Sequence, residues 1–205
     1  MYRPFVDDPN HLALLEGQRY VALRPAGPVS AVHEQVRASV KERLAGLPVS
    51  YPAQAHVTLT GFPKGTDLES VRALVGQWAR TIPRLQLEVE RVGVFPAPFQ
   101  IVIVQVRKTA ELFDALASLR ESARQRKFGD VLTTPAADWI FHMSVAYCAS
   151  LSASAWADVM RFVEKVGVPA AQCSVSDVEI VAFDNGREHC GGVFALSATG
   201  GDRHE

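Results

Sequence analysis

Two short tracts of this chain alternate between apolar and polar residues, which is the pattern of a β-strand with one buried face and one open face. The first covers residues 55–60 (Ala-His-Val-Thr-Leu-Thr) and the second covers residues 141–146 (Phe-His-Met-Ser-Val-Ala). In both tracts a histidine and a hydroxyl occupy the positions between the apolar side chains. We therefore expect two strands that present these polar groups on an open face of a sheet.

Apolar residues three and four positions apart predict four helices, at about residues 28–45, 67–80 and 109–127 and from Ser152 or Ser154 onward. Short runs rich in β-branched residues predict the other strands, at residues 20–23, 85–94, 100–106, 175–183 and 192–198. The tripeptide at residues 184–186 (Asp-Asn-Gly) has the composition of a hairpin turn before the last strand.

The order of these elements repeats, because a β-α-β-α-β series is followed by a β-α-β-α-β-β series and each histidine tract is the third element of its series. We therefore predict an α+β, bilobal, pseudo-twofold duplicated fold with two antiparallel sheets facing a central cleft and helices on the outer faces. The predicted domain covers residues 19–199, with lobes built from two related halves at about residues 19–95 and 100–199. Residues 1–18 form an N-terminal extension in this prediction, and residues 200–205 form a frayed tail.

Composition narrows the class of protein. The chain has 205 residues, of which 48% are hydrophobic and 21% charged, as in ordinary globular domains, and its net charge is −1, which gives no argument for binding long duplex nucleic acid. Its three cysteines show no Cys-x-x-Cys spacing, which favours a reducing, cytoplasmic location over a disulfide framework. We also expect no signal peptide and no membrane span, because apolar runs of the necessary length are lacking.

The two histidine tracts carry the candidate chemistry. His56 and Thr58, like His142 and Ser144, are two residues apart, so on a strand each pair points to one face at roughly 6.5–7 Å separation. Two imidazoles and two hydroxyls facing one cleft form a metal-free acid–base pair with donors for a phosphate. A zinc site using His189 and Cys190 is disfavoured because no acidic partner accompanies either tract histidine.

These tracts, His56-Val57-Thr58-Leu59 and His142-Met143-Ser144-Val145, resemble the paired motifs of the two-histidine phosphoesterase superfamily, and in particular its 2′-5′ RNA ligase-like branch. The resemblance covers about residues 19–199. It implies that His56 and His142 are the catalytic acid and base and that Thr58 and Ser144 bind the phosphate. It also implies an RNA or nucleotide substrate with a cyclic phosphate, without a metal or other cofactor.

Three further residues are candidates for substrate contact. Phe62 continues the polar face of the first tract, and Lys64 follows it in a loop. Tyr147 lies shortly after the second tract, in the region where many ligase-like members have an arginine. An aromatic ring can stack on a base, and a lysine can meet a phosphate. The remaining histidines, His11, His33 and His204, are expected at the surface.

Three functions fit this pattern. The first is hydrolysis of a 2′,3′-cyclic phosphate to a 2′-phosphate, the second is 2′-5′ RNA ligation at the same site, and the third is non-catalytic binding of RNA or a nucleotide. The intact histidine and hydroxyl pairs favour an enzyme, because binding alone does not require two titrating groups. The sequence does not indicate the oligomeric state or which histidine is the acid.

Overall fold

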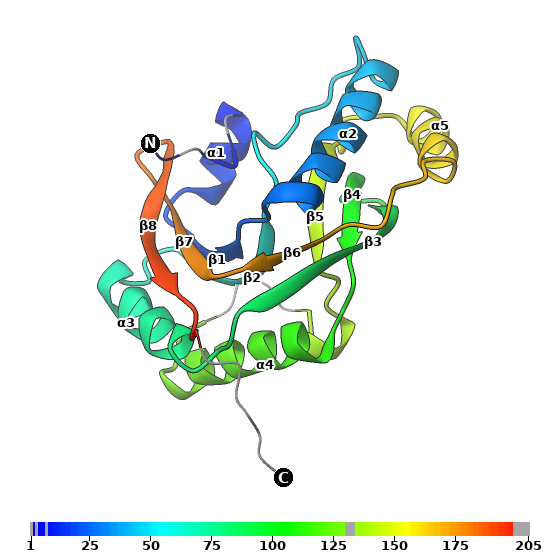
Figure 1. Cartoon of the computed structure of the whole chain (residues 1–205). Helices are drawn as coiled ribbons and strands as arrows, with labels where there is room; N and C mark the ends of the chain where they lie inside the picture. The colour runs from blue at the N-terminus through cyan, green and yellow to red at the C-terminus, as the bar shows by residue number, and fades with distance from the viewer. Residues whose placement is uncertain (1, 3, 7, 130–133, 199–205) are drawn as a thin grey trace.

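The computed structural model describes residues 2, 4–6, 8–129 and 134–198 of the chain, so the predicted tail at 200–205 and His204 lie outside the described residues (Figure 1). The helices and strands follow one another in this order: α1 (Pro9–Leu15), β1 (Arg19–Leu23), α2 (Gly27–Arg43), β2 (Val57–Phe62), α3 (Leu68–Ala79), β3 (Leu85–Phe95), β4 (Ile101–Val106), α4 (Ala110–Gln125), η1 (Ala136–Asp138), β5 (His142–Tyr147), α5 (Ala153–Val163), β6 (Gln172–Val175), β7 (Asp177–Asp184) and β8 (Arg187–Ala195).

Local sequence signals explain where several elements begin and turn. The side chains of Asp67, Thr109 and Ser152 accept hydrogen bonds from backbone N–H groups in the first turns of α3, α4 and α5. Asn185 and Gly186 both adopt positive φ angles, 56° and 67°, which the tight turn between β7 and β8 requires.

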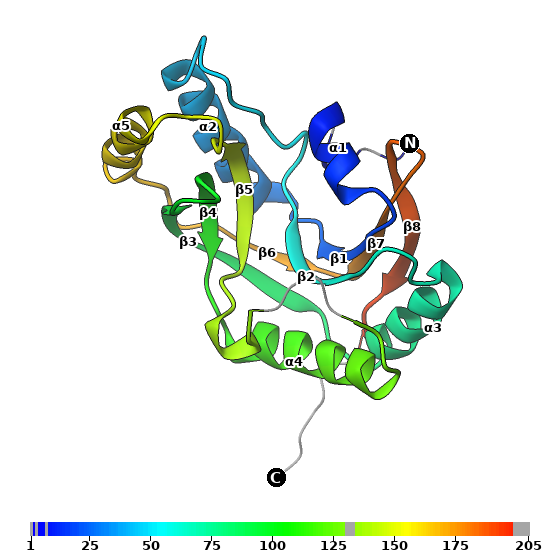
Figure 2. The ribbon, with the colours of Figure 1, turned by 180° about the vertical axis from the view of Figure 1, so that it is seen from behind.

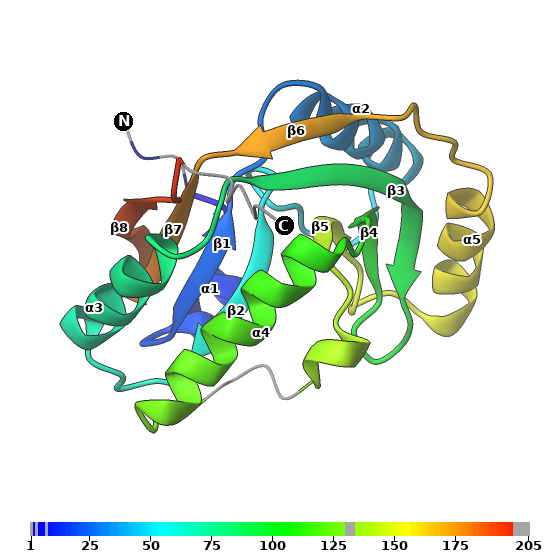
Figure 3. The same ribbon diagram turned by 60° about the horizontal axis from the view of Figure 1, so that its bottom comes forward.

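The strands form two antiparallel four-stranded sheets, as the sequence predicts. Sheet 1 has the order β2-β1-β7-β8, and sheet 2 has the order β5-β4-β3-β6. Helices α3 and α4 pack on each other, with α3 against β7 and β8 and α4 across β2 and β3, whereas α2 packs on β5 and β6 (Figure 3). The α+β class with two antiparallel sheets is therefore confirmed.

The two lobes do not coincide with the two halves of the sequence. β3 comes from the first half but pairs with β4, and β7 and β8 come from the second half but extend the sheet of β1. The predicted strand at residues 175–183 corresponds to β7 of sheet 1, except that Val175 ends a separate strand, β6 of sheet 2, which was not predicted. The predicted division of the lobes near residues 95–100 is thus corrected, because each sheet takes strands from both halves.

One large apolar core joins the two sheets with helices α2–α5, and a second, smaller cluster lies on the opposite face of sheet 1. This smaller cluster contains Phe5, Val6, Ala22, Val181 and Phe183, with Leu12 and Leu15 of α1 packed against it. The N-terminal extension is therefore a folded part of the structure that covers one face of sheet 1. Among the described residues no helix is long and apolar enough to cross a bilayer.

Candidate active site

The two histidine tracts lie on strands that face each other. β2 is an edge strand of sheet 1, β5 is an edge strand of sheet 2, and the two strands contact one another at the centre of the molecule (Figure 2). His56 immediately precedes β2, and His142 is the first residue of β5. Each histidine therefore lies at the start of its strand.

The two imidazoles are also held in the same way. The Nδ1 atom of His56 lies 3.3 Å from the carbonyl oxygen of Gln54, and that of His142 lies 2.9 Å from the carbonyl oxygen of Ile140. Because a carbonyl oxygen only accepts hydrogen bonds, each Nδ1 carries the proton and donates it. In the neutral ring this leaves the Nε2 lone pair of each histidine available to accept a proton.

Both imidazoles have perturbed pKa values. The pKa of His56 is lowered to about 3, chiefly by burial and in addition by positive charge on His142, His33 and Arg24, whereas the hydrogen bond with Gln54 acts in the opposite direction. Burial also lowers the pKa of His142, against the effect of its bond to Ile140. Burial therefore favours the neutral form of both rings.

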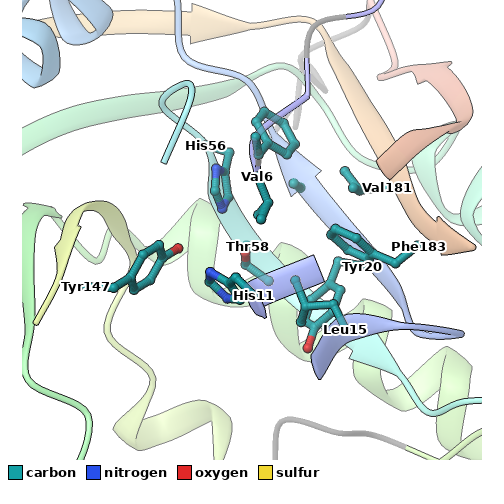
Figure 4. Close-up of a pocket in the computed structure, with 11 residues that line it drawn as sticks. Val6, His11, Leu15, Tyr20, His56, Thr58, Tyr147, Val181 and Phe183 are labelled. Atoms are coloured by element: carbon teal, nitrogen blue, oxygen red, sulfur yellow. The ribbon is translucent and has the colours of Figure 1, made fainter. Parts of the chain in front are cut away.

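The predicted hydroxyls accompany the imidazoles. Thr58 is half-buried and lines a small cavity together with His56 and Tyr147 (Figure 4). Ser144 is 7% exposed, and burial raises the pKa of Tyr147 while the nearby Ser144 hydroxyl acts in the opposite direction. Hydroxyl donors therefore stand next to both histidines.

Each histidine strand contains a one-residue shift in register at the same position. Val21 pairs with Thr60 and Ala22 with Thr58, so Leu59 is an extra residue in β2. Ile103 pairs with Ser144 and Val102 with Ala146, so Val145 is an extra residue in β5. Both extra residues stand three positions after the histidine. A bulge of this kind reverses the in–out alternation of the residues that follow it.

The bulges explain why two aromatic residues change roles relative to a regular strand. Phe62 is 1% exposed and packs in the core against Phe128, with ring centroids 5.7 Å apart, so its predicted contact with substrate is wrong. Tyr147, which simple alternation would direct into the core, instead faces the cavity that contains His56 and Thr58. One bulge thus removes Phe62 from the site, and the other brings Tyr147 into it.

Lys64 does not join the site. It is exposed in the loop after the far end of β2, about 20 Å along the strand from His56 at the usual rise per residue. Its aliphatic side chain lies beside Gly17, and its charge helps to lower the pKa of Glu16. The predicted phosphate contact of Lys64 is therefore wrong.

Two histidines expected at the surface lie at the site instead. His33 of α2 is fully buried, and its Nε2–H donates to the carbonyl oxygen of Ser144 at 2.8 Å, so it supports the strand that carries His142. Its position four residues after Val29 and three before Val36, on the apolar stripe of the helix, is a signal that sequence reasoning missed.

His11 of α1 contacts Tyr147 edge-to-face, with ring centroids 4.6 Å apart, and lines the same cavity as His56. No sequence pattern pointed to it, because it lies in the N-terminal extension, outside the repeated elements. Within the described part of the chain, no group of three His, Cys, Asp or Glu side chains is arranged to hold a metal ion.

Comparison with known proteins places this geometry in a wider context. Residues 25–187 match the family model of the 2'-5' RNA ligase superfamily, a span that contains both histidine tracts and begins after α1. No curated protein sequence matches the chain.

Solved structures share the fold at low sequence identity. A crystal structure described as a phosphoesterase superimposes with a TM-score of 0.59 at 15% identity and covers 89% of this chain and 99% of its own. Escherichia coli LigT without ligand gives a TM-score of 0.58 at 16% identity, covering 88% of this chain and 98% of its own. Kluyveromyces marxianus Usb1 gives 0.52 at 11% identity, covering 90% and 99%.

Proposed function

Because the chain belongs to the 2'-5' RNA ligase superfamily, we propose that it is a metal-independent phosphoesterase that hydrolyses 2′,3′-cyclic phosphates, on RNA ends or small nucleotides, to 2′-phosphates. The observation that carries this proposal is the matched pair of imidazoles. His56 and His142 each donate Nδ1–H to the backbone carbonyl two residues earlier, and they stand at the starts of β2 and β5, two edge strands that contact each other.

The proposed reaction uses one neutral and one protonated imidazole. The neutral ring accepts a proton from water through Nε2 while the water oxygen forms a bond to phosphorus, and the protonated ring donates its proton to the ribose O3′ as the P–O3′ bond breaks. The phosphate remains on O2′. Thr58 and Ser144 donate hydrogen bonds to the non-bridging oxygens, where negative charge increases in the transition state.

Related structures support a nucleotide as the substrate. Escherichia coli LigT has been crystallised in complexes with 3'-AMP and with ATP, and these structures match this chain with TM-scores of 0.53 and 0.52 at 15% identity. By this proposal the present chain binds the phosphate of a nucleotide between β2 and β5.

The direct test is incubation of the protein with the four 2′,3′-cyclic nucleotides, with and without EDTA, followed by phosphorus NMR of the products. We expect conversion to 2′-phosphates at a rate that EDTA does not change. Joining of cleaved RNA halves would instead identify a ligase, and binding of the nucleotides without turnover would identify a binding module. A rate lost in EDTA and restored by metal would contradict the mechanism.

The pKa values predict an acidic pH optimum. The active state needs one neutral and one protonated imidazole, so kcat/KM is largest between the two free-enzyme pKa values. The pKa values of His56 and His142 are both lowered from 6.5, so both limbs of the bell-shaped pH profile of kcat/KM move to lower pH. We expect kcat/KM for 2′,3′-cyclic AMP to peak below pH 6.5 and to fall by pH 8. A maximum above pH 7.5 would show that the histidines are not the titrating pair.

A further inference from the structure

The N-terminal segment covers the side of the site that carries His56. Residues 2, 4–6 and 8–15, here called the strap, precede the part of the chain that matches the family model (Figures 2 and 4). The carboxylate of Glu188 on β8 accepts hydrogen bonds from the backbone N–H groups of Phe5 and Val6, both at 2.7 Å. It also accepts one from the Tyr2 hydroxyl at 2.6 Å, and the Phe5 carbonyl accepts from Ala53 N–H at 2.7 Å.

Phe5 of the strap lies directly against the first imidazole. The centroids of the Phe5 and His56 rings are 4.2 Å apart. The Arg24 guanidinium lies 4.2 Å from the centroid of the Phe5 ring, and Phe5 is 2% exposed. The cavity that remains beside His56 and Thr58 has a volume of about 110 Å³. That volume holds water but is well below the roughly 300 Å³ of the smallest ordinary ligand pockets.

A larger groove opens on the other side of Tyr147. It has a volume of about 640 Å³, and Tyr147 and His11 line both this groove and the small cavity. Three large apolar side chains of its lining are exposed to solvent: Leu14 (77%), Phe99 (65%) and Leu47 (40%).

The charge of the groove indicates which part of a nucleotide it accepts. Among the described residues that line it there is no lysine or arginine, and the carboxylate of Asp8 caps α1 by accepting from two backbone N–H groups. A phosphate is therefore not bound there. A flat, uncharged base fits, because every base has a face that stacks on an aromatic ring such as Phe99.

We propose that the strap makes the site one-sided, so that it takes a single nucleoside in the groove and excludes a second one across the phosphorus. This inference rests on the proposed function and deepens it. In an in-line reaction at phosphorus the attacking and leaving oxygens stand on opposite sides. Ligation forms a bond from the 5′-oxygen of a second nucleoside, whose place next to His56 is filled by Phe5. Water needs no such space, so the strap favours hydrolysis over joining.

The test compares binding of 2′-AMP with binding of 2′-5′-linked diadenosine monophosphate, by calorimetry. For the wild-type chain we expect the dinucleotide to bind at least tenfold more weakly than 2′-AMP. Phe5→Ala, which opens the space beside His56, should reduce that difference several-fold. Phe113→Ala, which truncates a half-buried aromatic residue on α4, should leave the difference unchanged. Equal binding of both ligands to the wild-type chain, or a difference that Phe5→Ala does not alter, overturns the one-sided site.

The groove is tested by a second variant. Phe99→Ala should weaken 2′-AMP binding by about 5–150-fold, which corresponds to the roughly 1–3 kcal/mol of a base stacked on an aromatic ring. Val193→Ala, which truncates another exposed apolar residue on β8, is the matched control. Wild-type affinity in Phe99→Ala would refute the groove as the nucleoside site. These readouts need no turnover, so loss of the proposed catalysis with this binding pattern intact would refute the proposed function alone.

Discussion

Replacing either His56 or His142 with alanine is expected to remove turnover of 2′,3′-cyclic nucleotides, with a decrease in kcat/KM of about 10⁴-fold, the upper end of what one positioned acid or base contributes. The size of the effect follows from the site, where each imidazole presents Nε2 after donating Nδ1–H to a backbone carbonyl. Neither histidine can take both proton-transfer roles in one step. The measurement is the initial rate of 2′-phosphate formation at the pH optimum.

His189→Ala is the matched control for this loss. His189 lies on β8 with its side chain 45% exposed and Nε2 3.6 Å from the carboxylate of Asp184, away from the facing strands. Its replacement should leave kcat/KM within about twofold of the wild type, as expected for a surface substitution. A wild-type rate in either His56→Ala or His142→Ala would refute the acid–base pair, provided that circular dichroism shows the variant to be folded.

Removing a phosphate-binding hydroxyl is expected to have the next largest effect. Thr58→Ala or Ser144→Ala should lower kcat by about 10²–10³-fold, the loss typical of one donor to a transition-state oxyanion. KM should change less than kcat, because these hydroxyls strengthen their hydrogen bonds as charge develops on the phosphoryl oxygens. Single-turnover rates with 2′,3′-cyclic AMP give the chemical step directly.

Thr58→Ser separates the hydroxyl from the methyl group of the same residue. It keeps the donor and should recover most of the rate that Thr58→Ala loses. If Thr58→Ser is as slow as Thr58→Ala, the threonine acts through packing rather than through its hydroxyl. If Thr58→Ala itself stays within threefold of the wild-type kcat, Thr58 does not bind the reacting phosphate.

Those parts of the fold that depend on local chemistry could be predicted from the sequence. Asp67, Thr109 and Ser152 mark helix starts because their side chains compete for free backbone N–H groups wherever they occur. The turn at Asn185 and Gly186 follows from the ease with which these two residues adopt positive φ. The histidine tracts were predictable for the same reason, because alternation over a few residues places side chains on a face.

The parts that depend on distant contacts could not be predicted. β6 is only four residues long and is fixed by its pairing with β3, so nothing in its own sequence signals that β6 and β7 belong to different sheets. The bulge at Leu59 depends on the neighbouring strand, so the alternation that predicted Phe62 on the open face is interrupted there. The position of the strap could not be predicted for a related reason, because Phe5 and His11 are held by contacts with Glu188 and Tyr147 from the second half of the chain.

The position of the two histidine strands, β2 and β5, at sheet edges has a consequence for how the two lobes can move relative to each other. β2 and β5 each lie at the edge of a sheet, and in the described structure no strand ladder joins one to the other, although Ser50, before β2, forms an isolated antiparallel bridge with Tyr147 at the end of β5. Across this seam the two strands contact each other directly, whereas the His33 bond to Ser144 lies within the lobe of sheet 2, on which α2 packs. The seam can therefore widen or narrow slightly without breaking a backbone ladder. In the proposed reaction, this would let the two imidazoles follow a phosphorus atom as it passes from four-coordinate to five-coordinate geometry and back.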